Sequence, residues 1–257
     1  MPLITLTTDF GLKDHYVGVL KGELLKEAQD IRLIDISHNI KAFDIFHAAF
    51  VINEVATSFP KETVHVVMVN SFYNANPEII IARYSDQWFI APDNGLFSLV
   101  WEDLATVELF RLRKNEQITS GNLNRLFAHA ALDLADGIDV NEFADKVSVI
   151  SSSAVWKPII EKDYIRAAII YFDHFENAVV NLRRDEFENA RGGRRFVMML
   201  NRYEEFEQIA NGYGDVGDGD KVCFFNRAGY LEIAVNKGNA QGLFGLSLHD
   251  IVQIEFK

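Results

Sequence analysis

The sequence predicts an α/β domain with a mostly parallel, Rossmann-like sheet, followed by a small all-β domain with a barrel-like fold. In residues 1–150, strand-like apolar runs alternate with segments of helical apolar spacing, and the connections are short. This alternation is typical of a parallel sheet covered by helices. From Ile165 onward, short strand-like runs follow one another across turns rich in Gly, Asn and Asp, which favours an antiparallel barrel or sandwich.

The charge balance changes between the two predicted domains. Residues 1–152 carry 12 Lys and Arg against 21 Asp and Glu, whereas residues 153–257 carry 13 against 16. Ser151–Ser153 and Pro158 lie at this change, and segments with several serines and a proline are typical of linkers. We therefore predict an α/β domain over residues 1–152, a linker over 153–163 and a β domain over 164–257.

The elements of the first domain follow from the period of the apolar residues. Short apolar and β-branched runs predict strands at Ile4–Thr8, Ile31–Ile36, Val64–Val69, Ile79–Ile81 and Trp88–Ile90. Apolar residues at helical spacing predict helices at Tyr16–Ala28, Phe43–Phe59 and Leu123–Ala135. Pro60 ends the second of these helices, because proline cannot continue the hydrogen-bond ladder.

The second domain is predicted to consist almost entirely of strands. The runs that predict them are Ala167–Phe172, Ala178–Asn181, Phe196–Leu200, Lys221–Phe225, Leu231–Val235 and Ile251–Phe256. Cys223 lies within one of these apolar runs, so we expect an inert core thiol. The basic segment Arg191–Arg195 could bind an anion, but an exposed turn between strands is the favoured interpretation.

Composition excludes several classes of function. The net charge of −12 disfavours a protein that binds nucleic acid or an anionic membrane surface. With one cysteine and seven histidines that show no metal-ligand spacing, we expect neither a disulfide framework nor a metal site. The sequence has no GxGxxG, GxxxxGK[ST] or GxSxG pattern. We see no signal segment and no apolar run long enough to cross a membrane, and we expect a cytoplasmic protein.

Polar turns follow several of the predicted strands. Thr7–Gly11, Asp35–His38 and Pro92–Gly95 stand at strand ends in the first domain, where open α/β sheets bind their ligands. A carboxylate in such a turn can accept hydrogen bonds from both hydroxyls of a ribose, although Asp9 and Asp93 could instead cap turns or helices. In the second domain, Asp173–Asn177 offers a carboxylate, an aromatic ring and an amide, which suit a purine nucleoside as well as an ordinary β-turn.

Together these turns resemble one family along nearly the whole chain, the S-adenosyl-L-methionine (SAM) hydroxide adenosyltransferases. These SAM hydrolases are related to fluorinase and chlorinase. The segments that carry the resemblance are Leu6–Gly11, Asp14 with Tyr16–Gly18 and Lys21–Gly22, Asp35–His38, Phe43–Ile45, Ala91–Leu96, Asp173 with Phe175 and Asn177, and Leu231–Ala234 with Asn236 and Gly238–Ala240. The resemblance implies a homotrimer without a cofactor. SAM or adenosine would bind as a small-molecule substrate or ligand between the first domain of one subunit and the second domain of its neighbour.

The resemblance also implies roles for individual residues. Asp9 would bind the ribose hydroxyls, and Phe43 would place an aromatic ring against the ligand. Asp173 would hold the methionine ammonium group, while Phe175 and Asn177 would contact the adenine. The remaining positions that the resemblance places at the ligand are Asn70, Tyr73, Asn94, Asn226, Arg227 and Ala228.

The chain departs from the family at the catalytic positions. The Asp-Arg-His set that positions water in the family falls on Asn70, Pro77 and Asn122. Asn70 can hydrogen-bond to water but cannot act as a base at neutral pH. His129 and Arg83 are candidates to compensate, although a packed or surface histidine and a strand-decorating arginine are the favoured interpretations. Arg227 stands where the family often has Ser.

Three functions remain open on the sequence alone. The first is an adenosyltransferase in which water attacks the ribose C5′ of SAM and releases adenosine and L-methionine. The second is a trimeric module that binds SAM or adenosine without catalysis. The third, a purely structural trimer, would have no affinity for nucleosides.

Overall fold

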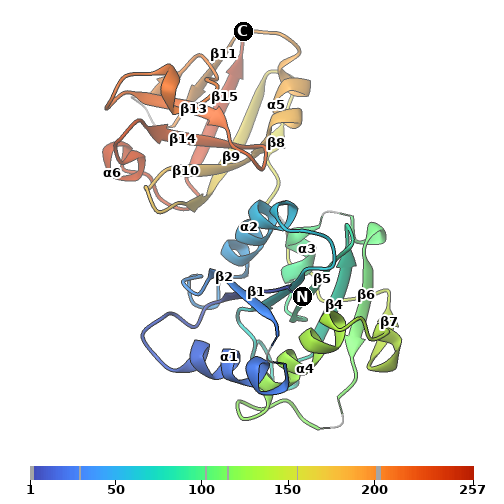
Figure 1. Cartoon of the computed structure of the whole chain (residues 1–257). Coiled ribbons are helices and arrows are strands. Elements are labelled where there is room, and N and C mark those ends of the chain that lie inside the picture. The colour runs from blue at the N-terminus through green and yellow to red at the C-terminus, as the bar shows by residue number, and fades with distance from the viewer. Residues whose placement is uncertain (1–2, 29, 102, 115, 155, 201–203) are drawn as a thin grey trace. The chain divides into compact units, whose positions relative to one another are not determined.

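The computed structural model describes residues 3–28, 30–101, 103–114, 116–154, 156–200 and 204–257. The chain divides into two compact units, residues 1–155 and residues 156–257 (Figure 1). Ser151 and Ser153 hydrogen-bond within the first unit, to Asp93 and Ser98, whereas Ile159–Ile160 already forms a strand of the second. Val155, which falls in the predicted linker, lies outside the described residues.

The first unit is built on a seven-stranded sheet with helices on both faces (Figure 1). In chain order its strands are β1 (Leu3–Thr8), β2 (Arg32–Ser37), β3 (Val64–Met68), β4 (Ile79–Tyr84), β5 (Gln87–Pro92), β6 (Glu108–Leu112) and β7 (Ala144–Val147). Their order across the sheet is β2-β1-β3-β5-β4-β6-β7. Neighbours from β2 to β5 run parallel, and β4, β6 and β7 add antiparallel pairs. The α/β class is therefore confirmed, with a mixed sheet.

The antiparallel half has a local cause that sequence periodicity did not reveal. Tyr84 of β4 pairs with Gln87 of β5, so Ser85 and Asp86 alone form the turn, and both have positive φ. A two-residue turn of this kind forces an antiparallel hairpin, because a parallel connection needs a crossover of a dozen or more residues. The expectation of a mostly parallel sheet thus holds for β2, β1, β3 and β5 and not for the other half.

Two pairs of helices cover the two faces of this sheet. One face packs against α1 (Tyr16–Glu27) and α4 (Leu123–Ala135), and the other against α2 (Ile45–Val55) and α3 (Leu96–Val100). The helix predicted from Phe43 begins at Ile45, since Asp44 is its N-cap and accepts a hydrogen bond from the amide of His47 at 3.0 Å. Phe43 thereby lies outside the helix, in the loop that leads to the candidate site.

The second unit is a nearly closed antiparallel sheet around its own core. Its strands are β8 (Ile159–Ile160), β9 (Tyr164–Phe172), β10 (Ala178–Arg183), β11 (Phe196–Met199), β12 (Glu205–Phe206), β13 (Lys221–Phe225), β14 (Tyr230–Val235) and β15 (Ile251–Phe256). The first half of β9 pairs with β15 and the second half with β10, so one long strand joins both parts of the sheet. This confirms the barrel-like β class.

Two features of the second unit differ from or refine the expectations. It contains two short helices, α5 (Arg184–Arg191) and α6 (Ala240–Phe244), so the basic segment begins at the end of a helix instead of between strands. Arg194 of that segment donates to the carbonyls of Lys162 and Ala190 and stacks on Phe256, which is a structural use of the cation. Cys223 is buried, as expected, and burial raises the pKa of its thiol to about 12. Among the described residues, no helix is long and apolar enough to cross a membrane.

Candidate functional site

The parallel strands of the first unit end at one edge, and the predicted polar turns lie along it. Asp9 follows β1, His38 follows β2, and Asn70 and Asn94 come just after β3 and β5. Backbone hydrogen bonds tie the turns together, from Gly11 to the carbonyl of His38 at 2.7 Å and from Asp9 to that of Met68 at 3.4 Å. This is the edge at which open α/β sheets bind ligands.

Asp9 is the centre of this edge. Its Oδ2 accepts two backbone hydrogen bonds, from Phe43 at 3.0 Å and from Asn70 at 3.1 Å. One oxygen therefore joins the loops that follow β1, β2 and β3. No described residue donates to Oδ1, and the residue is partly exposed. A carboxylate oxygen has two lone pairs, so the Asp9 carboxylate is fixed in place with acceptor capacity left for a ligand.

Both residues that donate to Asp9 have an unusual backbone. Phe43 has φ 66° and Asn70 has φ 48°, in the left-handed region that non-glycine residues seldom adopt. Such conformations cost free energy and gather at functional sites. The side chain of Phe43 is 73% exposed although its amide is anchored to Asp9. The strained backbone therefore lies in a loop whose aromatic side chain is uncovered.

A chain of polar side chains lies beside Asp9 and runs from the buried Thr8 and His38 to the exposed Asp35. Thr8 Oγ1 is 2.9 Å from His38 Nδ1, and His38 Nε2 is 3.2 Å from an oxygen of Asp35. The other Asp35 oxygen accepts from Lys21 at 2.6 Å. Burial would raise the pKa of Asp35, but hydrogen bonds from Lys21 and His38 outweigh it and lower the pKa below its usual value. These contacts fix the ends of β1 and β2 relative to each other.

Asn94 and Tyr73, predicted to contact the ligand, have structural partners here. Asn94 Nδ2 donates to the carbonyls of Val69 and Asn70 at 2.9 and 3.1 Å, and its Oδ1 accepts from the amide of Leu96 at 3.2 Å. Tyr73 accepts from the amide of Glu78 at 3.1 Å, and burial raises the pKa of its hydroxyl. Both side chains hold the loops that surround Asn70.

The three positions on which the resemblance places the catalytic set of the family differ in the hydrogen bonds that they make. The side chain of Asn70 makes no hydrogen bond to any residue that the structure describes. Pro77 has no polar side chain, but its carbonyl accepts from Lys114 at 3.1 Å. Asn122 is 8% exposed and engaged at both ends, because Oδ1 accepts from the amide of Thr119 at 2.7 Å and Nδ2 donates to the carbonyl of Gln117 at 2.9 Å.

Lys114 and Arg111 bring positive charge to this edge, which the sequence analysis missed. Arg111 lies 2.7 Å from Glu78, the residue after Pro77, and 3.6 Å from Asp93. Arg111 precedes the end of β6 and Lys114 follows it. Since β6 was not predicted, no sequence signal placed its end beside β4 and β5.

The two candidates for compensation lie away from this edge. Arg83 pairs with both oxygens of Glu62, at 2.9 and 2.6 Å, and stacks on Trp88. It stands four residues beyond Ile79, which pairs with Pro92 at the site edge, a separation of about 13 Å along a strand. His129 lies 3.8 Å from Glu27, the last residue of α1, and α1 starts at the site edge and runs about 18 Å from it. Neither side chain is placed to act beside Asn70.

In the second unit, Asp173 organises a compact loop. Its Oδ1 accepts from the amides of Phe175 at 2.9 Å and Asn177 at 2.8 Å, and its Oδ2 accepts from Asn177 Nδ2 at 3.0 Å. Phe175 is 70% exposed, whereas Asn177 is 2% exposed. The loop thus displays the aromatic ring predicted to meet adenine, while the amide predicted to do so holds the loop from inside the unit.

Two residues that the sequence analysis did not single out connect this loop to β14. Asn177 Nδ2 also donates to the hydroxyl of Tyr213 at 2.9 Å, and that hydroxyl donates to Glu232 Oε1 at 2.6 Å. Asn226 also hydrogen-bonds to Glu232. Burial raises the pKa of Glu232, although the hydrogen bonds from Tyr213 and Asn226 act in the opposite direction. A charged residue inside the apolar run of β14 was the one sequence signal for this network.

Asn226 and its neighbours form the turn between β13 and β14. Asn226 Oδ1 accepts from the amide of Tyr230 at 3.0 Å, and the carbonyl of Ala228 accepts from Arg183 at 3.2 Å. Arg227 is exposed. The structure therefore brings together Asp173, Asn177 and Asn226, which the sequence predicted as ligand residues, through Tyr213 and Glu232.

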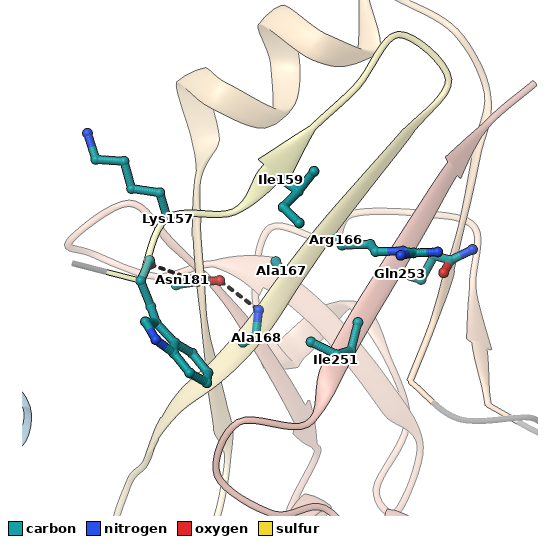
Figure 2. A pocket seen from close by; sticks show the side chains of 9 residues that line it. Lys157, Ile159, Arg166, Ala167, Ala168, Asn181, Ile251 and Gln253 are labelled. Atoms are coloured by element: carbon teal, nitrogen blue, oxygen red, sulfur yellow. Dashed lines mark hydrogen bonds between the residues drawn. The ribbon is translucent and has the colours of Figure 1, made fainter. Parts of the chain in front are cut away.

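A separate pocket of about 380 Å³ lies on the second unit. Figure 2 shows Arg166 and Gln253 side by side at one end of it and Lys157 pointing away from them at its rim. Asn181 closes a gap in the sheet here, accepting from the amide of Ala168 at 2.7 Å and donating to the carbonyl of Trp156 at 2.6 Å. None of the predicted ligand residues lines this pocket.

Comparison with known proteins relates both units to one family. Residues 4–144 match the family model of the SAM hydroxide adenosyltransferase N-terminal domain, and residues 167–253 match that of the C-terminal domain. A protein of Methanocaldococcus jannaschii named (R)-S-adenosyl-L-methionine hydrolase is 26% identical over 99% of this chain and 96% of its own length. One of the same name from Thermus thermophilus is 27% identical over 93% and 94%, and a fluorinase of Actinoplanes is 23% identical over 91% of each chain.

Solved structures show the same architecture. The chain is similar to an uncharacterised conserved protein of Thermotoga maritima, with a TM-score of 0.85 and 28% identity over 98% of this chain and 99% of that one. A conserved hypothetical protein of Thermus thermophilus matches with a TM-score of 0.75 and 24% identity over the full length of both.

Proposed function

The chain belongs to the SAM hydroxide adenosyltransferase family, and from that premise we propose that it acts on S-adenosyl-L-methionine as a hydrolase. Water would displace methionine from the ribose C5′ and give adenosine and L-methionine. The observation that carries the proposal is the geometry of Asp9. Its carboxylate is fixed by two backbone amides at the ligand edge of the sheet, and Oδ1 faces no protein donor among the described residues.

This chemistry asks little acid or base catalysis of the protein. The bond between C5′ and the water oxygen forms while the bond between C5′ and sulfur breaks. Sulfur takes the electron pair and leaves as the neutral thioether of methionine, and the attacking water loses a proton to solvent. The residues must therefore orient the ribose and the water and exclude other solvent. Asp9 suits the first task, and the uncommitted side chain of Asn70 can hydrogen-bond to water without taking its proton.

A second candidate function, a module that binds SAM or adenosine without cleaving it, is favoured by Asn122. Both polar atoms of its side chain hydrogen-bond to the loop that carries it, and the residue is 8% exposed, so the side chain is held in the loop and largely covered from a water molecule at the site. Pro77 supplies no side-chain group either. A binding module would keep the Asp9 geometry that we propose for the ribose while it lacked groups that position water, and the side chains at Pro77 and Asn122 fit that expectation.

We propose further that the working unit is a homotrimer in which SAM binds between the first unit of one subunit and the second unit of its neighbour. Support comes from the resemblance to the family and from two exposed aromatic rings, Phe43 and Phe175, one at the predicted ligand residues of each unit. Light scattering coupled to gel filtration measures the mass directly. A monomer that still binds SAM would contradict the shared site.

One experiment separates the two candidate functions. Purified protein is incubated with SAM, adenosine is quantified by chromatography, and thermal-shift titrations are run with SAM and with adenosine. Adenosine above the enzyme-free blank supports the hydrolase, and a melting shift without adenosine supports the binding module. The matched control is Asp14→Asn, since Asp14 is an exposed acid in the same loop as Asp9, against Asp9→Asn. A protein that responds to neither ligand overturns both candidates.

A further inference from the structure

Glu232 is a carboxylate in the interior of β14, where it is 8% exposed between the core residues Leu231 and Ile233. A chain of hydrogen bonds leads from it to the ligand loop of the second unit. It runs through the hydroxyl of Tyr213 at 2.6 Å to Asn177 Nδ2 at 2.9 Å, and on to Asp173 Oδ2 at 3.0 Å. The partners are 19 and 36 residues apart in the sequence, so this is a tertiary device and not a local turn.

The direction of donation along this chain is fixed by counting protons. Asn177 Nδ2 has two protons, one for Asp173 and one for Tyr213. The Tyr213 oxygen thus accepts from Asn177, and its single proton points to Glu232. Glu232 also receives a hydrogen bond from Asn226. Glu232 must therefore accept two hydrogen bonds. A carboxylate offers two acceptor oxygens for them, whereas a neutral acid or an amide offers a single carbonyl oxygen.

This arrangement lowers the free energy of unfolding. No described Lys, Arg or His forms an ion pair with Asp173 or Glu232, and Asp173, the charged side chain that acts electrostatically on Glu232, carries the same charge. A buried carboxylate without a cation lowers stability. A residue that only supported the core would be better apolar, so the cost indicates a function for the charge.

We propose that Glu232 is a positioning residue that acts through Tyr213 and Asn177 to hold residues 173–177 in the conformation that presents Asp173 and Phe175 to the ligand. That the ligand is a nucleoside rests on the proposed function, whereas the restraint on the loop does not. Loss of the Tyr213 hydroxyl leaves a proton of Asn177 without an acceptor. Loss of the Glu232 carboxylate leaves the proton of the Tyr213 hydroxyl without one. The loop then loses one side of the clamp that orients the Asp173 carboxylate.

Stability and binding should respond to Glu232 in opposite directions. Burial raises the pKa of Glu232, so folding disfavours its charged form relative to the unfolded chain. The stability that comes with this preference is present below the ordinary glutamate pKa and is lost as pH rises through the raised value. Glu232→Gln should therefore raise the melting temperature at pH 8 while it weakens the clamp. A purely structural residue would lose stability and binding together.

The test combines backbone amide exchange with adenosine titration on the full-length protein. The amides of Phe175 and Asn177 both donate to Asp173, so their exchange rates without ligand report the clamp itself. We expect Glu232→Gln and Tyr213→Phe to speed that exchange roughly tenfold and to weaken adenosine binding by a similar factor. Wild-type affinity should fall more steeply than that of Glu232→Gln as pH is lowered through the raised pKa of Glu232, because the variant keeps only the other carboxylates of the site, Asp9 and Asp173. Glu255→Gln and Tyr84→Phe, at exposed positions, are the matched controls.

The two readouts keep this proposal separate from the proposed function. If wild-type protein binds no adenosine but the two variants speed exchange at Phe175 and Asn177, the nucleoside site is wrong and the positioning role stands. Unchanged exchange in both variants overturns the positioning role whatever the protein binds. Glu232→Gln that binds adenosine with wild-type affinity and the wild-type pH dependence also overturns it.

Discussion

Asp9 in the first unit and Asp173 in the second are both carboxylates that organise a ligand loop, but they are held in different ways. Asp9 receives its hydrogen bonds from the backbone of Phe43 and Asn70, in loops far apart in the sequence. Asp173 also accepts from two backbone amides, but both belong to its own loop. It accepts a third hydrogen bond from the side chain of Asn177, which is linked in turn to Tyr213 and Glu232. The first arrangement uses backbone donors alone, whereas the second adds a side-chain donor that is itself held by other side chains.

This difference bears on the prediction that Asn70 stands where the family has Asp. A backbone amide donates to Asp9 whatever side chain its residue carries, so the position can change from Asp to Asn without disturbing the carboxylate. No such freedom exists around Asp173, where Asn177 must donate twice and Glu232 must accept. A change of side chain at Asn70 is therefore compatible with an unchanged position of the Asp9 carboxylate.

The largest effect on adenosine affinity is expected when the carboxylate of Asp9 is removed. Asp9→Ala removes the acceptor of two backbone amides that bridge three loops, and leaving such groups unsatisfied costs about 1–3 kcal/mol each. We expect adenosine affinity to fall by more than about 100-fold, measured by calorimetry, with a loss of roughly 3 kcal/mol in urea unfolding. Asp14→Ala is the control, and wild-type affinity in Asp9→Ala would show that the ribose binds elsewhere.

The two units should also respond differently to acid. His65 is fully buried between Thr5 and Phe89, and burial lowers its pKa to about 4. Its stabilising neutral form is retained above the ordinary value of about 6.5, and the contribution is lost as pH falls toward 4. At about 1.36 kcal/mol per pKa unit this amounts to about 3 kcal/mol. Glu232 acts in the opposite sense, because its raised pKa favours the second unit at low pH.

Acidification from pH 7 to 4 should therefore unfold the first unit before the second. Trp88 and Trp101 lie in the first unit and Trp156 in the second, so fluorescence of Trp156→Phe follows the first unit alone, and circular dichroism follows both. His65→Phe should shift the acid transition of the first unit to lower pH. A single transition at the same pH in both variants and the wild type would contradict this difference between the units.

Features that depend on residues close together in the sequence could be predicted, and features that depend on distant residues could not. The turn that carries Asp9 could be predicted because it follows an apolar run, and parallel strands place such turns on one edge. The β4–β5 hairpin was missed because its turn is Ser85–Asp86 instead of the Asn-Gly pattern that signals a two-residue turn. Tyr213 was missed because its partners Asn177 and Glu232 are 36 and 19 residues away. Asn122 was placed in the site by the resemblance to the family alone, and its two loop hydrogen bonds are visible only in the fold.

Placing the Asp, Arg and His of the family at the three predicted positions tests whether the loops held by Asp9 can form an active site. The triple change Asn70→Asp, Pro77→Arg and Asn122→His should raise the rate of adenosine formation from SAM at least about tenfold, because three groups would then orient the attacking water toward C5′. Asn122→His also removes the two hydrogen bonds of its loop, so the single variant is the control for stability. Retained SAM binding with an unchanged rate would show that these positions do not face the reacting carbon.

The smallest effect is expected at Asn70 alone, and it is the sharpest test of the comparison. Asn70→Gly removes the side chain but keeps the amide that donates to Asp9, and glycine adopts the positive φ of this position without strain. Adenosine affinity should therefore stay within about threefold of wild type in calorimetry. Asn177→Gly is the counterpart in the second unit and should weaken binding at least tenfold, because there the side chain holds the loop. Equal losses in the two variants would mean that Asp9, like Asp173, depends on side chains, and the contrast between the two carboxylates would fail.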